Sequence, residues 1–157
     1  MKFSTKEDIE APIVDTFALF SDFDQFERSA LRRGAEVRRT NSLKRHGTGM
    51  AWASAFKFRG KSRKIEAELI GYEPCDGYEV ELQSNDVTAY ATLELMSLSK
   101  SRTRASIAIE LKPKSLSGRL MVQTMRLGKS RLEKRFRKRA VDFALTIERQ
   151  CKSTNSA

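Results

Sequence analysis

Histidine and cysteine are scarce in this chain of 157 residues, which contains one histidine, His46, and two cysteines, Cys75 and Cys151. A zinc site or a histidine-centred catalytic relay therefore lacks most of the residues from which it is built, and we expect no metal and no cofactor. The cysteines lie far apart in a chain that opens without an apolar signal segment. We therefore expect no disulfide framework and a reducing, cytoplasmic location. No apolar run approaches the 18 residues of a membrane span.

The mass of 17.9 kDa is that of one ordinary domain. We assign residues 1–152 to this domain and residues 153–157 to a disordered polar tail. Area scaling gives a folded surface of about 8,000 Å² for this mass, so about two thirds of the surface of the unfolded chain can be buried. A core of that size needs no disulfide to stabilise it.

The hydrophobic pattern predicts an α+β fold in which helices flank a run of strands. Period-two alternation from Phe3 to Ile9 predicts a first strand, and apolar spacings of three and four residues after Pro12 predict a short helix. A second helix is expected over 25–33, with Gly34 as its C-cap. Turn residues then separate six predicted strands, at 35–45, 50–58, 62–72, 78–84, 87–98 and 102–112. Alternating apolar residues in these strands predict an antiparallel meander with one apolar face.

The C-terminal segment from Leu116 to Cys151 has a helical apolar period. A continuous helix of that length would be roughly 50 Å long, which exceeds the width of a domain of this size, about 40 Å. We therefore expect a bend or break near Gly128.

The opening EDIEAPIVDTFALFSDFDQF (7–26) and the tail LSGRLMVQTMRLGKSRLEKRFRKRAVDFALTIE (116–148) resemble the START/Bet v 1-like (SRPBCC) superfamily, in its polyketide cyclase/dehydratase branch. The match is carried by framework residues at both ends of the chain: Ile9, Ala11, Pro12, Phe17, Asp22 and Glu148. This resemblance implies a helix-grip fold, in which a curved antiparallel sheet of about seven strands wraps a long C-terminal helix. It also implies a mostly apolar cavity between sheet and helix. Members include carriers, receptors and cyclases, so the fold does not fix the ligand.

On a helix-grip reading, some residues of the predicted inner face are candidates to line that cavity, although ordinary core packing is an alternative for each. The candidates are Thr5, Glu7, Trp52, Ser54, Phe56, Arg63, Ile65, Tyr78, Ala91, Met121 and Met125. The polar ones would orient the polar end of a ligand, or Glu7 and Arg63 reach the rim or pair with each other. The methionines suit an adaptable apolar surface, or they fill gaps.

His46, Asp22 and Asp24 look like catalytic groups only by residue type. His46 lies in a predicted turn, so we expect a surface imidazole and not a general base. The two aspartates are expected to end or cap helices. Phosphate loops and nucleophile elbows have no matching motif, and no catalytic residue is identified.

The net charge of +10 is concentrated at the C-terminus, where residues 114–152 carry twelve basic and three acidic side chains. We interpret the basic run at 126–139 as a solvated helix face whose long stems cover the apolar stripe. An anionic membrane or ligand headgroup is the alternative, and nucleic acid or an acidic partner is less favoured because the run lacks stacking aromatics.

The leading hypothesis is a non-catalytic protein that binds or transports a hydrophobic small molecule, such as a lipid, quinone or polyketide-like compound. The first alternative is a polyketide cyclase/dehydratase-like enzyme. A further alternative is an interaction protein that uses its basic C-terminal helix on an anionic surface.

Overall fold

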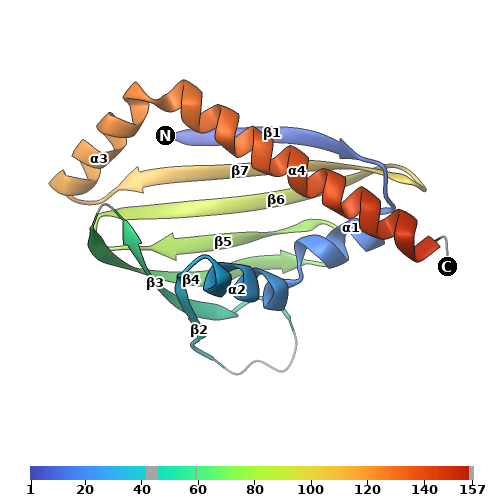
Figure 1. Ribbon diagram of the computed structural model, residues 1–157, viewed down its shortest axis with the longest axis horizontal. Helices are drawn as coiled ribbons and strands as arrows, with labels where there is room; N and C mark the ends of the chain where they lie inside the picture. The colour runs from blue at the N-terminus through green and yellow to red at the C-terminus, as the bar shows by residue number, and fades with distance from the viewer. Residues whose placement is uncertain (42–45, 59, 156–157) are drawn as a thin grey trace.

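The computed structural model describes residues 1–41, 46–58 and 60–155. One antiparallel sheet lies beneath four helices (Figure 1). In chain order the elements are β1 (Lys2–Ile9), α1 (Ile13–Phe20), α2 (Phe23–Arg32), β2 (Glu36–Arg39), β3 (Ala51–Phe58), β4 (Lys61–Glu73), β5 (Gly77–Gln83), β6 (Val87–Ser99), β7 (Arg102–Pro113), α3 (Leu116–Leu127) and α4 (Lys129–Asn155).

The seven strands lie in the order β1-β7-β6-β5-β4-β3-β2, and every neighbouring pair is antiparallel. Consecutive strands from β2 to β7 therefore form the predicted meander, and β1 closes its far edge against β7. The sheet curves around the C-terminal helix α4, which crosses its concave face (Figure 1). This is the predicted α+β helix-grip fold.

The strand predicted at 35–45 is too long. β2 ends at Arg39, and the Thr40 amide makes the last bond of this edge, to Ala51 O at 2.9 Å. The Asn41 side chain then donates to Gly49 O at 2.6 Å, so the chain already turns at this point. Residues 42–45, which the prediction included, lie outside the described residues. The other five predicted strands are confirmed, with ends that differ by at most one residue.

Both short N-terminal helices are present, although α2 begins two residues before the predicted start at 25 and ends one residue before the predicted end at 33. Pro12 precedes α1, and the carboxylate of Asp22 caps α2 by accepting from the Gln25 amide at 3.2 Å. At the other end of α2, Gly34 adopts a φ of +88°, which only glycine reaches without strain. The Ala35 amide then bonds back to Ala30 O at 3.1 Å, which completes a Schellman-type end.

The predicted helix break occurs at Gly128. α3 ends at Leu127 and α4 begins at Lys129, so the two helices point in different directions (Figure 1). The expected disordered tail is too long, because α4 continues to Asn155. Cys151 is buried in the core one turn earlier, and this contact holds the end of the helix in place. Residues 156–157 lie outside the described part of the chain.

The filled core lies at one end of the concave face, where α1 and the C-terminal half of α4 cover β1, β6 and β7. Its buried members include Ile9, Phe17, Phe20, Leu93, Ala105, Ala144 and Ile147. A second cluster joins Phe23 of α2 to Met50 and Leu69. The accessible surface of the molecule is 10593 Å², larger than the roughly 8,000 Å² that area scaling gives for this mass. The excess shows that the fold is less compact than an average domain of this mass.

Candidate ligand-binding site

Strand register places most of the large apolar side chains of the sheet on the concave face. Ile109 of β7 lies opposite Ala91 of β6, and Ala91 lies opposite Val80 of β5. All three are half-buried although they lie in the middle of the sheet. The apolar face therefore continues beyond the part that α1 and α4 cover.

A pocket of about 700 Å³ lies at the α3 end of this face. Its apolar lining combines sheet residues with the inner side of α3: Phe56, Ile65, Leu82, Val87, Ala89, Leu111, Met121, Val122 and Met125. Its polar lining comes from the ends of β4 and β5 and the turn after β5: Lys61, Ser62, Arg63, Lys64, Gln83, Ser84, Asn85 and Asp86. The volume and the apolar lining with polar groups at one side are typical of small-molecule sites.

The N-terminus of α3 is fixed to the β5–β6 turn, and this contact places the helix over the pocket. Ser115 caps α3 by accepting from the Gly118 amide at 3.0 Å, and its hydroxyl donates to Asp86 Oδ1 at 2.9 Å. The Lys114 amide donates to Asp86 O at 2.9 Å. A Cβ at Gly118 would lie only 2.0 Å from Asp86 O, so only glycine permits this approach.

Five of the eleven predicted cavity residues meet in this pocket: Phe56, Arg63, Ile65, Met121 and Met125. The other six have different surroundings, described next. The lining residues that were not predicted as a site include Leu111, Val122 and the turn at 84–86. The position of the helix break was predictable, but the contact of α3 with the turn after β5 was not.

Trp52 positions α2 and lies outside the pocket lining. Its indole N–H donates to Glu27 Oε1 at 2.7 Å, and Arg39 donates to the same oxygen at 2.7 Å. Arg39 also pairs with Asp24 at 2.8 Å. Its hydrogen bond to Glu27 is the largest of the effects that raise the pKa of the Arg39 guanidinium. This cluster ties α2 to β2 and β3 across the sheet edge.

Tyr78 is a core residue that joins β5 to the end of α1. Its hydroxyl donates to Phe20 O at 2.6 Å, and its ring packs edge-on against Phe23 with centroids 5.4 Å apart. Burial raises the pKa of the phenol well above its ordinary value, and the nearby Tyr72 adds to the shift. The phenol therefore stays neutral and serves as a hydrogen-bond donor.

Thr5 and Glu7 lie on β1, far from Arg63 on β4, because β7, β6 and β5 separate the two strands. The hydroxyl of Thr5 donates to Glu7 Oε1 at 2.7 Å, and Arg137 of α4 approaches the same oxygen at 4.0 Å. The alternative in which Glu7 and Arg63 pair with each other is therefore wrong. Glu7 instead connects β1 to the basic helix.

Ser54 and Ala91 lie on the concave face, half-buried, and neither is among the residues that line the pocket. Ser54 is opposite Ile65 in the β3–β4 register, and Ala91 is opposite Val80 in the β5–β6 register. They belong to the face that continues from the pocket toward the filled core.

His46 is exposed, as predicted, and its ring lies 5.4 Å from the ring of Phe23. The prediction that the two aspartates cap or end helices holds for Asp22. Asp24 lies in the first turn of α2, where it pairs with Arg39. Among the described residues no group of three or more His, Cys, Asp or Glu side chains could hold a metal ion. No helix in the described part of the chain is long and apolar enough to cross a membrane.

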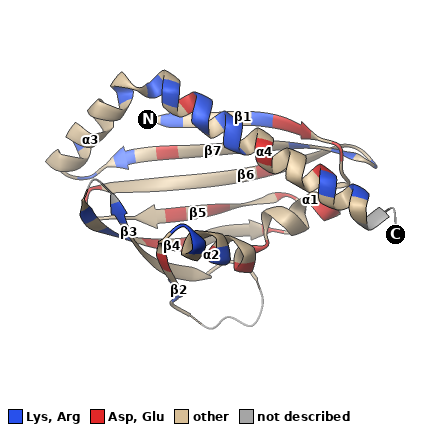
Figure 2. Cartoon of the chain, in the orientation of Figure 1, with Lys and Arg blue, Asp and Glu red and all other residues tan. Residues whose placement is uncertain are grey.

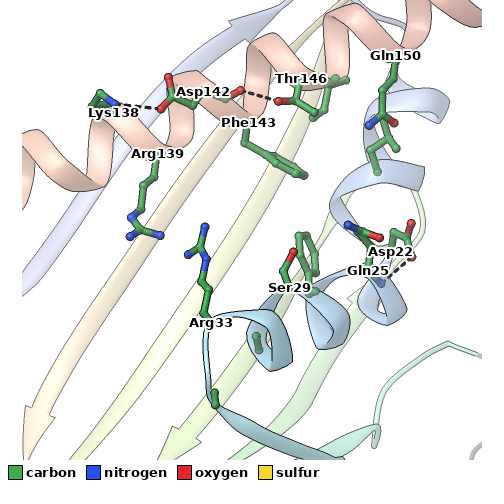
Figure 3. A pocket seen from close by; sticks show the side chains of 15 residues that line it. Asp22, Gln25, Ser29, Arg33, Lys138, Arg139, Asp142, Phe143, Thr146 and Gln150 are labelled. Atoms are coloured by element: carbon green, nitrogen blue, oxygen red, sulfur yellow. Dashed lines mark hydrogen bonds and ion pairs between the residues drawn. The ribbon is translucent and has the colours of Figure 1, made fainter. Parts of the chain in front are cut away.

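A second, wider pocket of about 1100 Å³ lies between α2 and α4. Its floor is aromatic, with Phe26 and Phe143 rings 5.9 Å apart. At its mouth Arg33 and Arg139 point toward one another, and Lys138 is bonded to Asp142 at 3.4 Å (Figure 3). This pocket could not be predicted from the sequence, because it depends on how two helices that are distant in the chain face each other.

Comparison with known proteins supports the fold. No family model matches the chain, and no curated protein matches it in sequence. Among solved structures, the Zhui aromatase/cyclase from Streptomyces sp. R1128 superposes with a TM-score of 0.64 at 9% identity, covering 96% of this chain and 94% of that one. The chain has the helix-grip fold of START and Bet v 1-like proteins.

Two further structures agree with this assignment. Ara h 8.0201 has a TM-score of 0.60 at 10% identity and covers 98% of both chains. A START superfamily protein from Mycobacterium smegmatis has a TM-score of 0.54 at 14% identity, covering 87% of this chain and 97% of that one. At these identities the likeness concerns the arrangement of the chain and not its chemistry.

Proposed function

We propose that this protein binds a hydrophobic small molecule, without chemical change, in the pocket of about 700 Å³ beneath α3. The observation that carries the proposal is that the apolar face of the sheet extends under α3 but is not filled there by side chains. Apolar interiors are close-packed by default, so an unfilled apolar hollow of this size favours an occupant.

The lining supports a ligand with a large apolar body and a small polar end. Met121 and Met125 of α3 line the pocket on the side opposite the sheet, and their flexible side chains adapt to ligands of different shape. At one side of the pocket, the Arg63 guanidinium supplies hydrogen-bond donors. Lipids, quinones and polyketide-like compounds share this division into an apolar body and a polar end. The pocket between α2 and α4 has more polar than apolar lining residues, so it offers less apolar surface to the body of such a ligand.

The test is a titration with 8-anilinonaphthalene-1-sulfonate, a fluorescent probe with an apolar body and one charged end. Ala89 lines the pocket, so Ala89→Phe should fill the hollow and weaken probe binding at least tenfold. The matched control is Ala108→Phe, on the convex face of the neighbouring strand β7, which should bind the probe like the unmodified protein. Equal binding by Ala89→Phe and the unmodified protein would refute the proposal.

Native mass spectrometry of the purified protein would then identify the natural ligand class. A bound species that is released on denaturation and extracts into organic solvent is the expected result. Its mass should disappear from preparations of Ala89→Phe and remain in those of Ala108→Phe.

A polyketide cyclase/dehydratase-like activity is the second candidate, because an aromatase/cyclase is among the structures with the same fold. Such an enzyme guides a reactive chain by the shape of its cavity and a few polar groups. Arg63 is the residue of the pocket best suited to polarise a carbonyl. Under this alternative Arg63→Ala abolishes turnover of a polyketide-like substrate and leaves the fold intact, whereas absence of any turnover by the unmodified protein favours the carrier.

A further inference from the structure

The helix α3 is apolar on two opposite faces, and the sheet uses only one of them. On the inner side, Gly118 and Val122 are buried and Met121 and Met125 line the pocket. The opposite side carries three exposed leucines: Leu116, Leu120 and Leu127, which are 75%, 57% and 91% exposed.

The three leucines form one stripe. They are spaced by four and seven residues, which are helical repeats that return to the same face of an α-helix. Leucine is among the residues most often buried, and one exposed leucine needs no explanation. Three in a single row on one short helix form a patch for which a binding partner is expected.

All charged side chains in the stretch of chain around this stripe are basic. Residues 111–132 contain six Lys and Arg side chains and no Asp or Glu. Arg119 and Arg126 lie together along one edge of the leucine stripe, since 100° per residue places both between it and the inner face. Figure 2 shows α3 without acidic segments. An apolar stripe flanked by cations is the pattern of a helix that lies in the headgroup layer of an anionic membrane.

The basic run of α4 does not have this combination. Its apolar residues Leu132 and Phe136 are half-buried, and the Phe136 ring lies 6.4 Å from that of Phe3 on β1. This basic run therefore offers charge alone. The break at Gly128 turns α3 away from α4 and brings it to one end of the molecule (Figure 1). A terminal position leaves the leucine stripe free to meet a flat surface.

We infer that α3 docks on a bilayer that carries anionic lipids, with Leu116, Leu120 and Leu127 at the level of the acyl chains and Arg119 and Arg126 at the phosphates. Docking uses only the outer side of α3 and does not depend on an occupant of the pocket beneath it. It does place that pocket next to the bilayer.

Flotation of the full-length protein with vesicles tests the inference. At about 0.15 M salt the protein should bind vesicles that contain 30% phosphatidylserine in phosphatidylcholine and bind pure phosphatidylcholine much more weakly. Changing the three leucines together to serine should remove the binding, because the apolar contribution is lost. The matched control changes Val14, Leu31 and Leu145, three exposed apolar residues of α1, α2 and α4, to serine and should leave binding intact.

A separate pair of substitutions tests how much the basic side chains of α3 contribute to vesicle binding. Each basic residue near an anionic surface is worth about fivefold in affinity, so changing Arg119 and Arg126 to glutamine should weaken binding about 30-fold. Arg28 and Arg32, one turn apart on the exposed face of α2, are the control pair. Failure of the unmodified protein to float, or flotation that survives the three serines, would overturn the inference. So would a leucine-dependent dimer in sedimentation velocity, since the stripe would then join two copies of this chain.

Discussion

The two ends of the concave face carry similar apolar side chains but are packed differently. At the α1 end, Ile9, Phe20 and Ile147 are buried against one another. At the α3 end, Leu82, Ile65 and Met125 surround a pocket of about 700 Å³. The difference comes from the covering helices. α1 and the end of α4 insert large side chains toward the sheet, whereas the inner side of α3 presents Gly118 and two flexible methionines.

The strands therefore carry a continuous apolar face, and the helices decide where that face is filled. A hollow of this kind lowers stability relative to a filled core, because its lining loses packing contacts. A protein that keeps such a hollow uses the remaining core and the α2 contacts to hold its fold. The following predictions compare the effects of substitutions at the filled end and at the hollow end on the stability of the protein.

The largest effect is expected from a pair of leucines on neighbouring strands. Leu69 of β4 is fully buried beside Phe23 and Met50, whereas Leu82 of β5 lines the pocket. Leu69→Ala should lower the free energy of unfolding by about 3 kcal/mol, because it removes apolar contact and leaves a cavity. Leu82→Ala should cost less than about 1.5 kcal/mol, since its side chain already borders empty space. Urea denaturation measures both, and equal losses would contradict the comparison.

Glu27 holds α2 over the filled end through one carboxylate oxygen that accepts from Trp52 and Arg39. Glu27→Ala should therefore lower the free energy of unfolding by about 2 kcal/mol, in the range expected when hydrogen bonds to a charged group are lost. The control is Glu36→Ala, an exposed carboxylate on β2, which should stay within about 0.5 kcal/mol of the unmodified protein. The fluorescence of Trp52, the only tryptophan of the chain, should change in the first variant alone.

Gly118 fixes α3 above the hollow end. Gly118→Ala places a methyl group where Asp86 O lies 2.0 Å away, so we expect α3 to shift and the free energy of unfolding to fall by about 1–3 kcal/mol. Gly128→Ala is the matched control, because its added Cβ meets nothing closer than 4.0 Å. That variant should be as stable as the unmodified protein or slightly more stable. Thermal unfolding compares the two, and a Gly118→Ala protein of normal stability would show that the close contact is not needed.

The smallest effect concerns Tyr78, whose buried phenol has a raised pKa in the folded protein. The unfolded chain releases this proton near pH 10 while the folded protein retains it. The free energy of unfolding therefore keeps its full value below about pH 10 and falls as the pH rises above it. Tyr78→Phe should cost about 1 kcal/mol at neutral pH through the lost hydrogen bond to Phe20 O. Its stability should also decline less than that of the unmodified protein between pH 9 and pH 11. Parallel declines would show that the phenol ionises equally in both states.

Sequence periodicity was sufficient to predict the sheet, the helices and the break at Gly128, because each depends on local pattern and turn residues. The candidate site was only partly predictable. Phe56, Ile65 and the two methionines could be assigned to the pocket from strand alternation and helical spacing. Trp52 and Tyr78 could not be separated from them, since their partners Glu27 and Phe20 O are distant in the chain.

The exposed leucines of α3 show the same limit of prediction from sequence periodicity. In the sequence Leu116 and Leu120 belong to the helical apolar period that runs from Leu116 to Cys151, and this period by itself predicts that they face the sheet. The break at Gly128 allows α3 to turn independently, so these leucines are exposed instead. Periodicity identifies an apolar face, but only the three-dimensional structure shows what that face meets.

The central claim, that the α3 end of the sheet is a ligand-binding hollow, is tested most directly by methionine-methyl NMR. Met121 and Met125 line the hollow, Met50 is buried in the filled part, and Met96 is exposed on β6. On titration with 8-anilinonaphthalene-1-sulfonate, the methyl signals of Met121 and Met125 should shift and saturate together while those of Met50 and Met96 stay in place. Saturation with no shift at Met121 or Met125, or the largest shift at Met96, would contradict the account.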